Sequence, residues 1–271
     1  MDFTLIDAPA ATPVAPYLGG KKNLAKRLVE RIRTIPHATY VEPFVGMGGV
    51  FLRRPFRAAA EVINDVSTDV ATLFRVLQRH YEALMDMLRW QLTSREEFER
   101  LLAAAPDTLT DLERSARFLY LQRCSFGAKV VGRNFGVDVG RPGRFDVTKL
   151  ASLLESAHER LAGVTIERLP WPDLLDRYDR PETLFYCDPP YWGCEMDYGV
   201  GVWERDDFTR LAHRLRRLKG SWLLSLNDVP DVRRLFRGCQ MEEVRVSYGI
   251  GTHTGSRVPA GELIISPPNG A

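Results

Sequence analysis

The sequence lacks the residue patterns that build metal and disulfide sites. Neither the four cysteines nor the five histidines show the spacing of metal ligands, and the cysteines are Cys124, Cys187, Cys194 and Cys239. No C-x-x-C pair occurs. This pattern argues against a zinc site and a disulfide framework, and it favours a reduced cytosolic setting. We therefore expect a cytoplasmic protein that binds no metal.

Long apolar runs and an excess of charge are absent too. No stretch of 18 apolar residues occurs, so no membrane-spanning helix is expected. Residues 1–16 show no basic segment followed by an apolar one, which argues against a secretory signal. Because they are rich in Ala and Pro, they are expected to form a loosely attached leader. The net charge of +2 does not by itself indicate a nucleic-acid partner.

The order of apolar patterns predicts an α/β fold. A length of 271 residues suits one α/β domain that carries an insertion. Helices are expected near residues 22–35, 67–125, 148–161 and 206–219, and strands near 40–44, 62–63, 164–169, 183–187, 222–226, 241–246 and 262–265. Alternating strands and helices imply a doubly wound, mainly parallel sheet. Ligands of such sheets bind beyond the carboxyl ends of the strands.

The clearest chemical motif, Asp188-Pro189-Pro190-Tyr191, directly follows the apolar strand expected at 183–187. Two prolines restrict φ and lack N–H groups, so the loop is stiff and its carbonyl oxygens can face a ligand. The Asp188 carboxylate and the Pro189 carbonyl can together accept both hydrogens of an amino group, which directs the nitrogen lone pair outward. Tyr191 offers a ring on which a base can stack, worth about 1–3 kcal/mol. The alternative is a simple strand-ending turn, which the full tetrapeptide and the upstream glycines disfavour.

A glycine-rich turn, Gly46-Met47-Gly48-Gly49, follows the first expected strand. Glycine lets the backbone approach a ligand closely, but Phe51 stands where the dinucleotide-binding motif has its third glycine. Asp65 follows the second expected strand, where an acid can accept hydrogen bonds from ribose hydroxyls. It could equally cap the helix that starts near Ser67, and the sequence does not separate these two roles.

The segment from residue 114 to 149 is basic, with eight Lys or Arg against two acids. From residue 127 to 146 it holds five glycines and little periodicity, which is typical of an irregular loop that orders on a ligand. Arg can pair with guanine, and Asn with adenine, in the major groove. The expected DNA contacts are Arg123, Lys129, Arg133, Asn134, Arg141 and Arg144. A second basic run, 205–219, is expected to be an ordinary solvated helix face.

Together these motifs resemble the Dam-type DNA adenine methyltransferases, many of which accompany restriction systems or prophages. The resemblance rests on Gly-Gly-Lys (19–21), Glu-Pro-Phe-Val-Gly-x-Gly-Gly-Val-Phe (42–51), Asn-Asp (64–65) and Asp-Pro-Pro-Tyr (188–191), in this order. It extends to residues 117–123 and to Ser225-Leu226-Asn227-Asp228, and it spans roughly residues 16–266.

The resemblance implies a Rossmann-like sheet that binds S-adenosylmethionine and transfers its methyl group to N6 of an adenine flipped out of double-stranded DNA. It implies a catalytic domain formed by residues 1–109 and 163–271, with a mostly helical and loop target-recognition insertion at 110–162. The implied catalytic residues are Asp188, Pro189, Pro190 and Tyr191. The implied cofactor contacts are Tyr17, Lys21, Glu42, Phe44, Gly46, Gly48, Asp65 and Asp188.

Some alternatives stay open at this point. Residues 125–129 differ from the recognition residues of the GATC-specific members, so a GATC target is not implied. A methyltransferase of the same fold could act on cytosine N4, RNA adenine or a protein glutamine, and a relative could bind DNA without catalysis. A nicotinamide-dependent oxidoreductase is disfavoured by the missing glycine. Trp192 and Tyr198 either wall a base pocket or pack beneath the loop. The sequence does not determine the oligomeric state, for which a monomer is the expectation.

Overall fold

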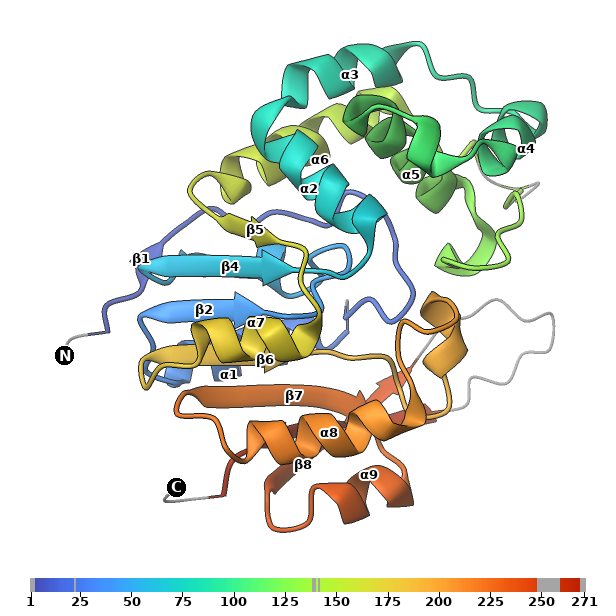
Figure 1. Cartoon of the computed structure of the whole chain (residues 1–271). Coiled ribbons are helices and arrows are strands. Elements are labelled where there is room, and N and C mark those ends of the chain that lie inside the picture. Colours follow the sequence, from blue (N-terminus) through green and yellow to red (C-terminus); the bar gives the residue numbers. More distant parts are fainter. Residues whose placement is uncertain (1–2, 22, 138–139, 141, 248–258, 269–271) are drawn as a thin grey trace.

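The computed structural model of the chain describes residues 3–21, 23–137, 140, 142–247 and 259–268. Its main sheet has seven strands in the order β5-β4-β2-β6-β7-β9-β8. The parallel strands are β2 (Thr39–Glu42), β4 (Ala60–Asn64), β5 (Thr165–Glu167), β6 (Thr183–Cys187) and β7 (Ser221–Asn227). In contrast, β9 (Pro259–Ser266) runs antiparallel to its neighbours β7 and β8 (Gln240–Ser247). This mixed α/β fold confirms the expected α/β class with a mainly parallel sheet (Figure 1).

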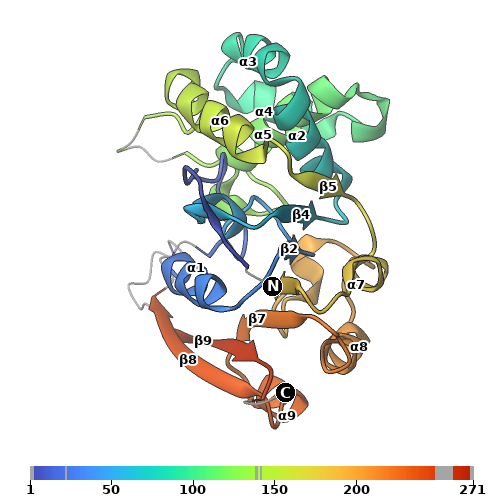
Figure 2. The ribbon, with the colours of Figure 1, turned by 90° about the vertical axis from the view of Figure 1, so that its left-hand side faces the viewer.

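Helices cover both faces of the sheet, which is why its central strands are so apolar. Every residue of β6 is buried. Seen along the sheet in Figure 2, α1 (Ala25–Thr34) lies on one face, and α7 (Trp171–Tyr178) and α8 (Arg205–Leu215) lie on the other. Strands buried on both faces have continuous apolar sequences rather than alternating ones. The short helix α9 (Pro230–Leu235) joins β7 to β8.

A helical unit stands beside the β5 edge of the sheet (Figure 1). It consists of α2 (Thr68–Arg79), α3 (Tyr81–Arg89), α4 (Arg95–Ala103), α5 (Asp111–Cys124) and α6 (Val147–Leu161). Both α5 and α6 pack against α2 and α3, so the predicted insertion at 110–162 shares one packed unit with the helices before it. Between α5 and α6, the described residues form a loop with one short 3-10 helix (Phe126–Ala128). No helix in the described part of the chain is long and apolar enough to cross a membrane.

The prediction of a loosely attached leader is wrong for the described residues of 1–16. Strand β1 (Ile6–Asp7) pairs with β3 (Phe56–Arg57), and Val14 is buried in the core. Alanine and proline suit a linker by composition, but here small side chains allow the segment to pack closely. The sequence also missed α7 and α9, both short helices with proline in their first turn, where its missing N–H costs nothing.

A buried ion triad joins the helical unit to the sheet. Glu61 of β4 accepts hydrogen bonds from Arg54 and, at 2.6 and 3.0 Å, from both terminal nitrogens of Arg160 in α6. All three side chains are buried. The guanidinium of Arg54 also lies 3.6 Å from the centre of the Tyr40 ring. Since one carboxylate serves two buried cations, the position of α6 depends on Glu61.

We predict that Glu61→Ala destabilises the protein by about 3–5 kcal/mol, because it leaves two buried guanidinium groups without their counter-charge. Urea denaturation gives the free energy of unfolding. The control is Asp86→Ala, which breaks the exposed Asp86–Arg89 pair and should cost less than about 1 kcal/mol. Equal losses in the two variants would contradict this account of the triad.

Candidate active site

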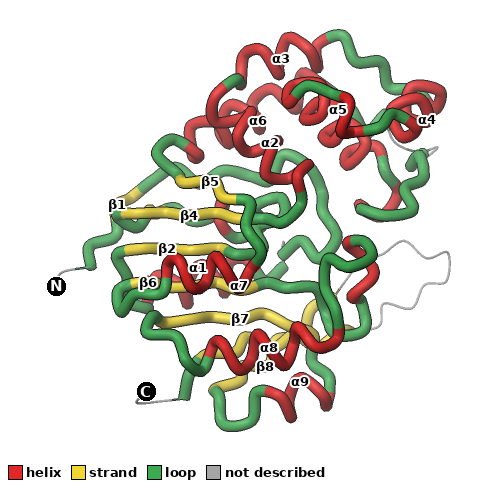
Figure 3. Tube along the Cα trace, viewed as in Figure 1, coloured by secondary structure: helices red, strands yellow, loops and turns green. Residues whose placement is uncertain are grey.

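A cavity of about 620 Å³ opens at the carboxyl ends of β2, β4 and β6. In Figure 3 the loops that leave these strands converge at one edge of the sheet. The strand order reverses at β2. Among the strands of this sheet β2 is the first along the chain, and the next two along the chain, β4 and β6, lie on opposite sides of it. Open α/β sheets bind their ligands at such a point. The cavity therefore lies where the fold predicts a site.

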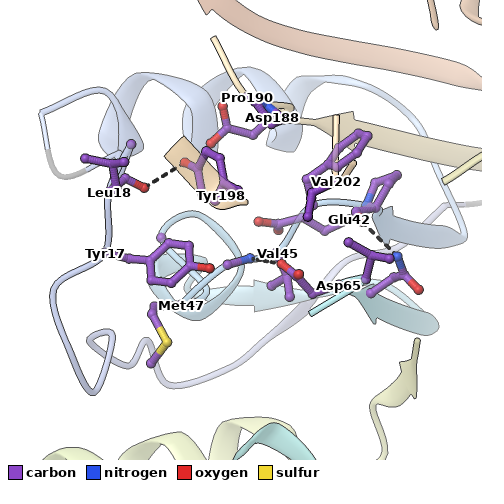
Figure 4. A pocket seen from close by; sticks show the side chains of 18 of the residues that line it. Tyr17, Leu18, Glu42, Val45, Met47, Asp65, Asp188, Pro190, Tyr198 and Val202 are labelled. Atoms are coloured by element: carbon purple, nitrogen blue, oxygen red, sulfur yellow. Dashed lines mark hydrogen bonds between the residues drawn. The ribbon is translucent and has the colours of Figure 1, made fainter. Parts of the chain in front are cut away.

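The glycine-rich turn after β2 forms one wall of the cavity. Gly46 has φ +49°, and a Cβ atom on it would lie 3.0 Å from the Tyr17 ring. Tyr17 thus covers the backbone of the turn, and both residues line the cavity (Figure 4). Gly48, at φ +72°, does not line the cavity, and its Cβ would lie 2.8 Å from Leu52. Gly48 is therefore needed for the conformation of the turn, while Gly46 lets the backbone of the turn lie close to the cavity.

Asp65 lies opposite Tyr17 and holds the turn in place (Figure 4). Its Oδ2 accepts from the Gly46 N–H at 2.9 Å, and its Oδ1 accepts from the Ser67 N–H at 2.9 Å. Ser67, rather than Asp65, is the N-cap of α2. Burial raises the pKa of Asp65 to about 6, against the effect of the two backbone hydrogen bonds. Asp65 therefore presents a carboxyl group to the cavity and is not the helix cap.

Asn64, just before Asp65, joins three loops around the cavity. Its side-chain nitrogen donates to the Pro43 carbonyl at 2.9 Å and to the Leu169 carbonyl at 3.1 Å. Its side-chain oxygen accepts from the Leu169 N–H at 2.7 Å. These bonds tie the ends of β2, β4 and β5 together. Asn64 therefore has a structural role in the Asn-Asp motif, whereas Asp65 presents a carboxyl group to the cavity.

Asp188 follows β6 and lines the cavity, as Asp65 does. Two donors bind its Oδ1, the Lys21 ammonium at 2.8 Å and the Ser225 hydroxyl at 2.8 Å. Burial raises the pKa of Asp188, and Lys21 and Ser225 oppose that rise. The hydroxyl of the buried Tyr186 bonds in turn to Ser225 at 2.9 Å. With Oδ1 occupied in this way, Oδ2 is the oxygen available to a ligand.

The rest of the Asp188–Tyr191 loop is held tightly. Pro190 lines the cavity, whereas Pro189 and Tyr191 do not. No hydrogen bond reaches the Pro189 carbonyl from the described residues. The Tyr191 hydroxyl accepts from Lys21 at 2.7 Å. The Pro189 carbonyl, next to Asp188 in the chain, therefore has no donor among the described residues.

Two aromatic residues after the loop have different roles. Tyr198 lines the cavity, lies 6.0 Å from the Tyr17 ring and donates to the Leu18 carbonyl at 3.0 Å (Figure 4). Trp192 packs on Phe208 of α8, with 4.9 Å between the ring centres. Its backbone N–H and carbonyl both bond to the side chain of Asn227. Tyr198 is therefore a wall of the cavity, and Trp192 packs beneath the loop.

Glu42, at the end of β2, brings a second buried carboxyl group to the cavity. Burial raises its pKa to about 8, although a hydrogen bond from Tyr40 at 2.8 Å and the charge of Arg54 lower it. Burial therefore favours the protonated form of Glu42.

Sequence reasoning missed the aromatic and basic part of the wall. Trp203 is buried and meets Phe44 edge-on at 5.5 Å. Trp171, at the start of α7, lies 6.0 Å from Trp203. Arg53 and Arg210 also line the cavity. Trp171 lies just beyond β5, after residues 168–170, so its place near the carboxyl end of a parallel strand was the signal that could have found it.

The predicted DNA contacts lie in different surroundings. Lys129 and Asn134 are exposed. Arg133 donates to Gln122, and Arg144 donates to the Ser125 carbonyl, so these guanidinium groups brace their own loop. Arg123 donates to the Val14 carbonyl and lines the cavity. Arg141 lies outside the described residues.

The basic side of α8 is mostly a solvated helix face, as expected, except that Arg210 also lines the cavity. Its arginines pair with acids nearby: Arg205 with Glu195, Arg210 with Asp207, and Arg214 with Asp176 and Asp179. Among the described residues, no group of three or more His, Cys, Asp and Glu side chains could hold a metal ion.

Comparison with known proteins identifies the family. The model for D12 class N6 adenine-specific DNA methyltransferases matches residues 17–250. The chain belongs to this family.

Similar curated proteins agree with the family. A DNA adenine methylase from Vibrio cholerae serotype O1 is 25% identical, over 92% of this chain and 93% of its own length. A type II methyltransferase from Lactococcus lactis subsp. cremoris is 24% identical over 94% of each chain. The DNA adenine methylase of Escherichia coli K12 is 23% identical over 83% of this chain and 84% of its own length. The chain is thus an enzyme of DNA adenine N6 methylation, which confirms the predicted reaction over its alternatives.

We predict that Glu42→Gln makes the stability of the protein less dependent on pH. The folded state holds the Glu42 proton up to about pH 8, whereas the unfolded chain releases it near 4.5. Wild-type stability therefore falls as pH rises through this window, by up to about 1.4 kcal/mol per pH unit. Denaturation at pH 5 and pH 9 should show the variant gaining on wild type at the higher pH. A constant difference would show that Glu42 is ionised throughout.

Proposed function

We propose that the chain holds S-adenosylmethionine in the cavity and methylates N6 of an adenine flipped out of double-stranded DNA. The observation that carries this proposal is the pair of free acceptors, Asp188 Oδ2 and the Pro189 carbonyl, beside a cavity at the switch point of the sheet. Because the proposed substrate is DNA, we also propose that the protein acts in the cytoplasm. The monomeric state expected from the sequence stays a prediction.

The cavity suits S-adenosylmethionine in size and chemistry. Its volume of about 620 Å³ lies within the range of about 300–1,000 Å³ that is usual for small-molecule sites. Asp65 offers carboxylate lone pairs to ribose hydroxyls, and Glu42 offers a partner to an ammonium group. Tyr17, Phe44 and Gly46 provide flat apolar walls. When bound, this cofactor supplies an electrophilic methyl group on a positively charged sulfur.

We also propose that the sheet is Rossmann-like, and its strand order supports this. Numbered along the chain, its five parallel strands have the spatial order 3-2-1-4-5. Doubly wound dinucleotide-binding sheets share this order. The cofactor would lie beyond the first and fourth of these strands, which are β2 and β6.

The chain itself orients the amine and stabilises the charge that develops on it. Asp188 Oδ2 and the Pro189 carbonyl accept the two N6 hydrogens, so the lone pair points away from the loop. Lys21 and Ser225 hold Oδ1, which prevents the carboxylate from rotating away. Preorganised acceptors of this kind need no rearrangement as the nitrogen becomes positive. Tyr191 serves as the stacking face for the base.

DNA recognition is assigned to residues 110–162, with residues 1–109 and 163–271 as the catalytic domain. Lys129 and Asn134 are the exposed candidates for DNA contacts. Arg133 and Arg144 would need to leave their loop partners before they could contact DNA. Flipping the adenine costs a few kcal/mol, which contacts in the pocket offset.

We predict that Asp188→Asn lowers kcat by about 10²-fold or more, because one acceptor becomes a donor at the reacting amine. The assay transfers labelled methyl groups from S-adenosylmethionine to unmethylated double-stranded DNA and identifies the labelled nucleoside. Wild type should yield N6-methyladenine. The control is Asp206→Asn, an exposed acid in the first turn of α8. Wild-type activity in Asp188→Asn would refute this mechanism.

We predict that Gly46→Ala weakens binding of S-adenosylmethionine roughly tenfold or more. The new Cβ atom would push aside the ring of Tyr17, which lines the cavity. The matched control is Gly163→Ala. Gly163 has a similar left-handed φ of +76°, but nothing lies within 4 Å of its Cβ position. Calorimetry should show normal affinity for the control. Equal losses would mean that backbone strain, and not the Tyr17 contact, weakens binding.

A further inference from the structure

Glu262 on β9 is a buried acid that the proposed mechanism leaves unused. Its side chain is fully buried, and neither carboxyl oxygen has a hydrogen bond of regular geometry. It does not line the cavity. In the sheet it stands directly opposite Asn227 of β7, which holds the Asp188–Trp192 loop. A buried carboxyl group without partners is costly, so its retention needs an explanation.

The hydrogen bonds of Lys21 determine which groups are left for Glu262 to contact. An ammonium group has three hydrogens, and Lys21 directs them to the Gly19 carbonyl at 3.0 Å, Asp188 at 2.8 Å and Tyr191 at 2.7 Å. Because the Tyr191 hydroxyl is an acceptor here, its own hydrogen must go to another group. The hydroxyl acts as a donor on the pKa of the neighbouring Glu262, although no hydrogen bond of regular geometry joins the two side chains.

The charges around Lys21 do not balance if both carboxyl groups are ionised. One buried cation would then face two carboxylates, Asp188 and Glu262, which low-dielectric surroundings disfavour. Asp188 receives two strong hydrogen bonds and Glu262 receives none of regular geometry. Burial raises the pKa of Glu262, and the Asp188 charge adds to the rise, while Lys21 and Tyr191 oppose it. These hydrogen bonds therefore stabilise the ionised form of Asp188, whereas Glu262 has no comparable donors.

Other groups near Glu262 do not change this balance. On the same face of the β8–β9 hairpin, Glu242 is already paired with Arg27 and Arg31 of α1. On β7, Ser225 and Asn227 are neutral. At the hairpin end, Asp228 is paired with Arg233.

We propose that Glu262 is a positioning residue for methyl transfer: it holds the catalytic loop through the Tyr191 hydroxyl and keeps the proton that lets Asp188 remain ionised beside Lys21. This inference rests on the proposed role of Asp188. Ionisation of Glu262 at alkaline pH draws Lys21 away from Asp188, so kcat falls as pH rises. Glutamine imitates the protonated acid, whereas alanine removes the contact.

The test compares Glu262→Gln and Glu262→Ala with wild type in the methyl-transfer assay across pH. We expect Glu262→Gln to keep kcat within about threefold at pH 7 and to lose the alkaline fall, since a factor of three is under 1 kcal/mol. Glu262→Ala should lower kcat roughly 10- to 100-fold with little change in KM for S-adenosylmethionine. Combining it with Tyr191→Phe should add little, because both act through one hydroxyl. Glu243→Gln, on the exposed side of the same hairpin, is the control.

A stability measurement gives a second readout without catalysis. A carboxyl group with a raised pKa in the folded state makes the protein less stable as pH rises from its unfolded pKa to its folded pKa. Glu262→Gln should therefore unfold at a higher temperature than wild type at alkaline pH, and at a similar temperature near pH 4.

Several outcomes would overturn the inference. They are a wild-type kcat and pH profile in Glu262→Ala, a defect in Glu262→Gln as large as in Glu262→Ala, or a stability difference that does not depend on pH. The inference fails alone if Asp188→Asn is inactive while the Glu262 variants behave as wild type. If Asp188→Asn is active, the proposed mechanism fails with it.

Discussion

The ion pair between Lys21 and Asp188 determines how the site is assembled. Lys21 precedes α1, whereas Asp188 ends β6, so the pair joins segments that lie far apart in the chain. Burying such a pair costs free energy unless further hydrogen bonds complete its surroundings. The Gly19 carbonyl, Tyr191 and Ser225 supply those bonds. The same bonds immobilise the loop that carries the two amine acceptors.

The four buried carboxyl groups in and near the site differ in the hydrogen-bond donors that surround them. Asp188 has strong donors and faces the position proposed for the reacting amine, while Asp65 has backbone donors and faces the position proposed for the ribose. Burial raises the pKa of all four carboxyl groups, and Glu262 alone among them has no hydrogen bond of regular geometry to oppose that rise. The proposed cationic cofactor would favour the ionised form of the carboxyl groups that line the cavity, which burial alone disfavours.

The sequence predicted the parts of the site that depend on local order along the chain. Asp188–Tyr191 and the glycine turn each follow an apolar strand, and parallel strands end at one edge, so their convergence could be foreseen. Trp203, Arg123 and Glu262 could not be placed in this way, because their positions depend on long-range packing. Residues 1–16 were misjudged for the same reason, since composition does not show that Val14 packs into the core. The division at 110–162 and the cofactor and DNA contacts remain predictions.

The most direct test of the cavity as the cofactor site is a crystal structure of the chain with S-adenosylhomocysteine. The account predicts that the ligand lies in the cavity, with its ribose hydroxyls on Asp65, its amino-acid ammonium near Glu42 and its sulfur facing the Asp188–Tyr191 loop. A ligand bound elsewhere, or one whose sulfur points away from Asp188, would contradict it.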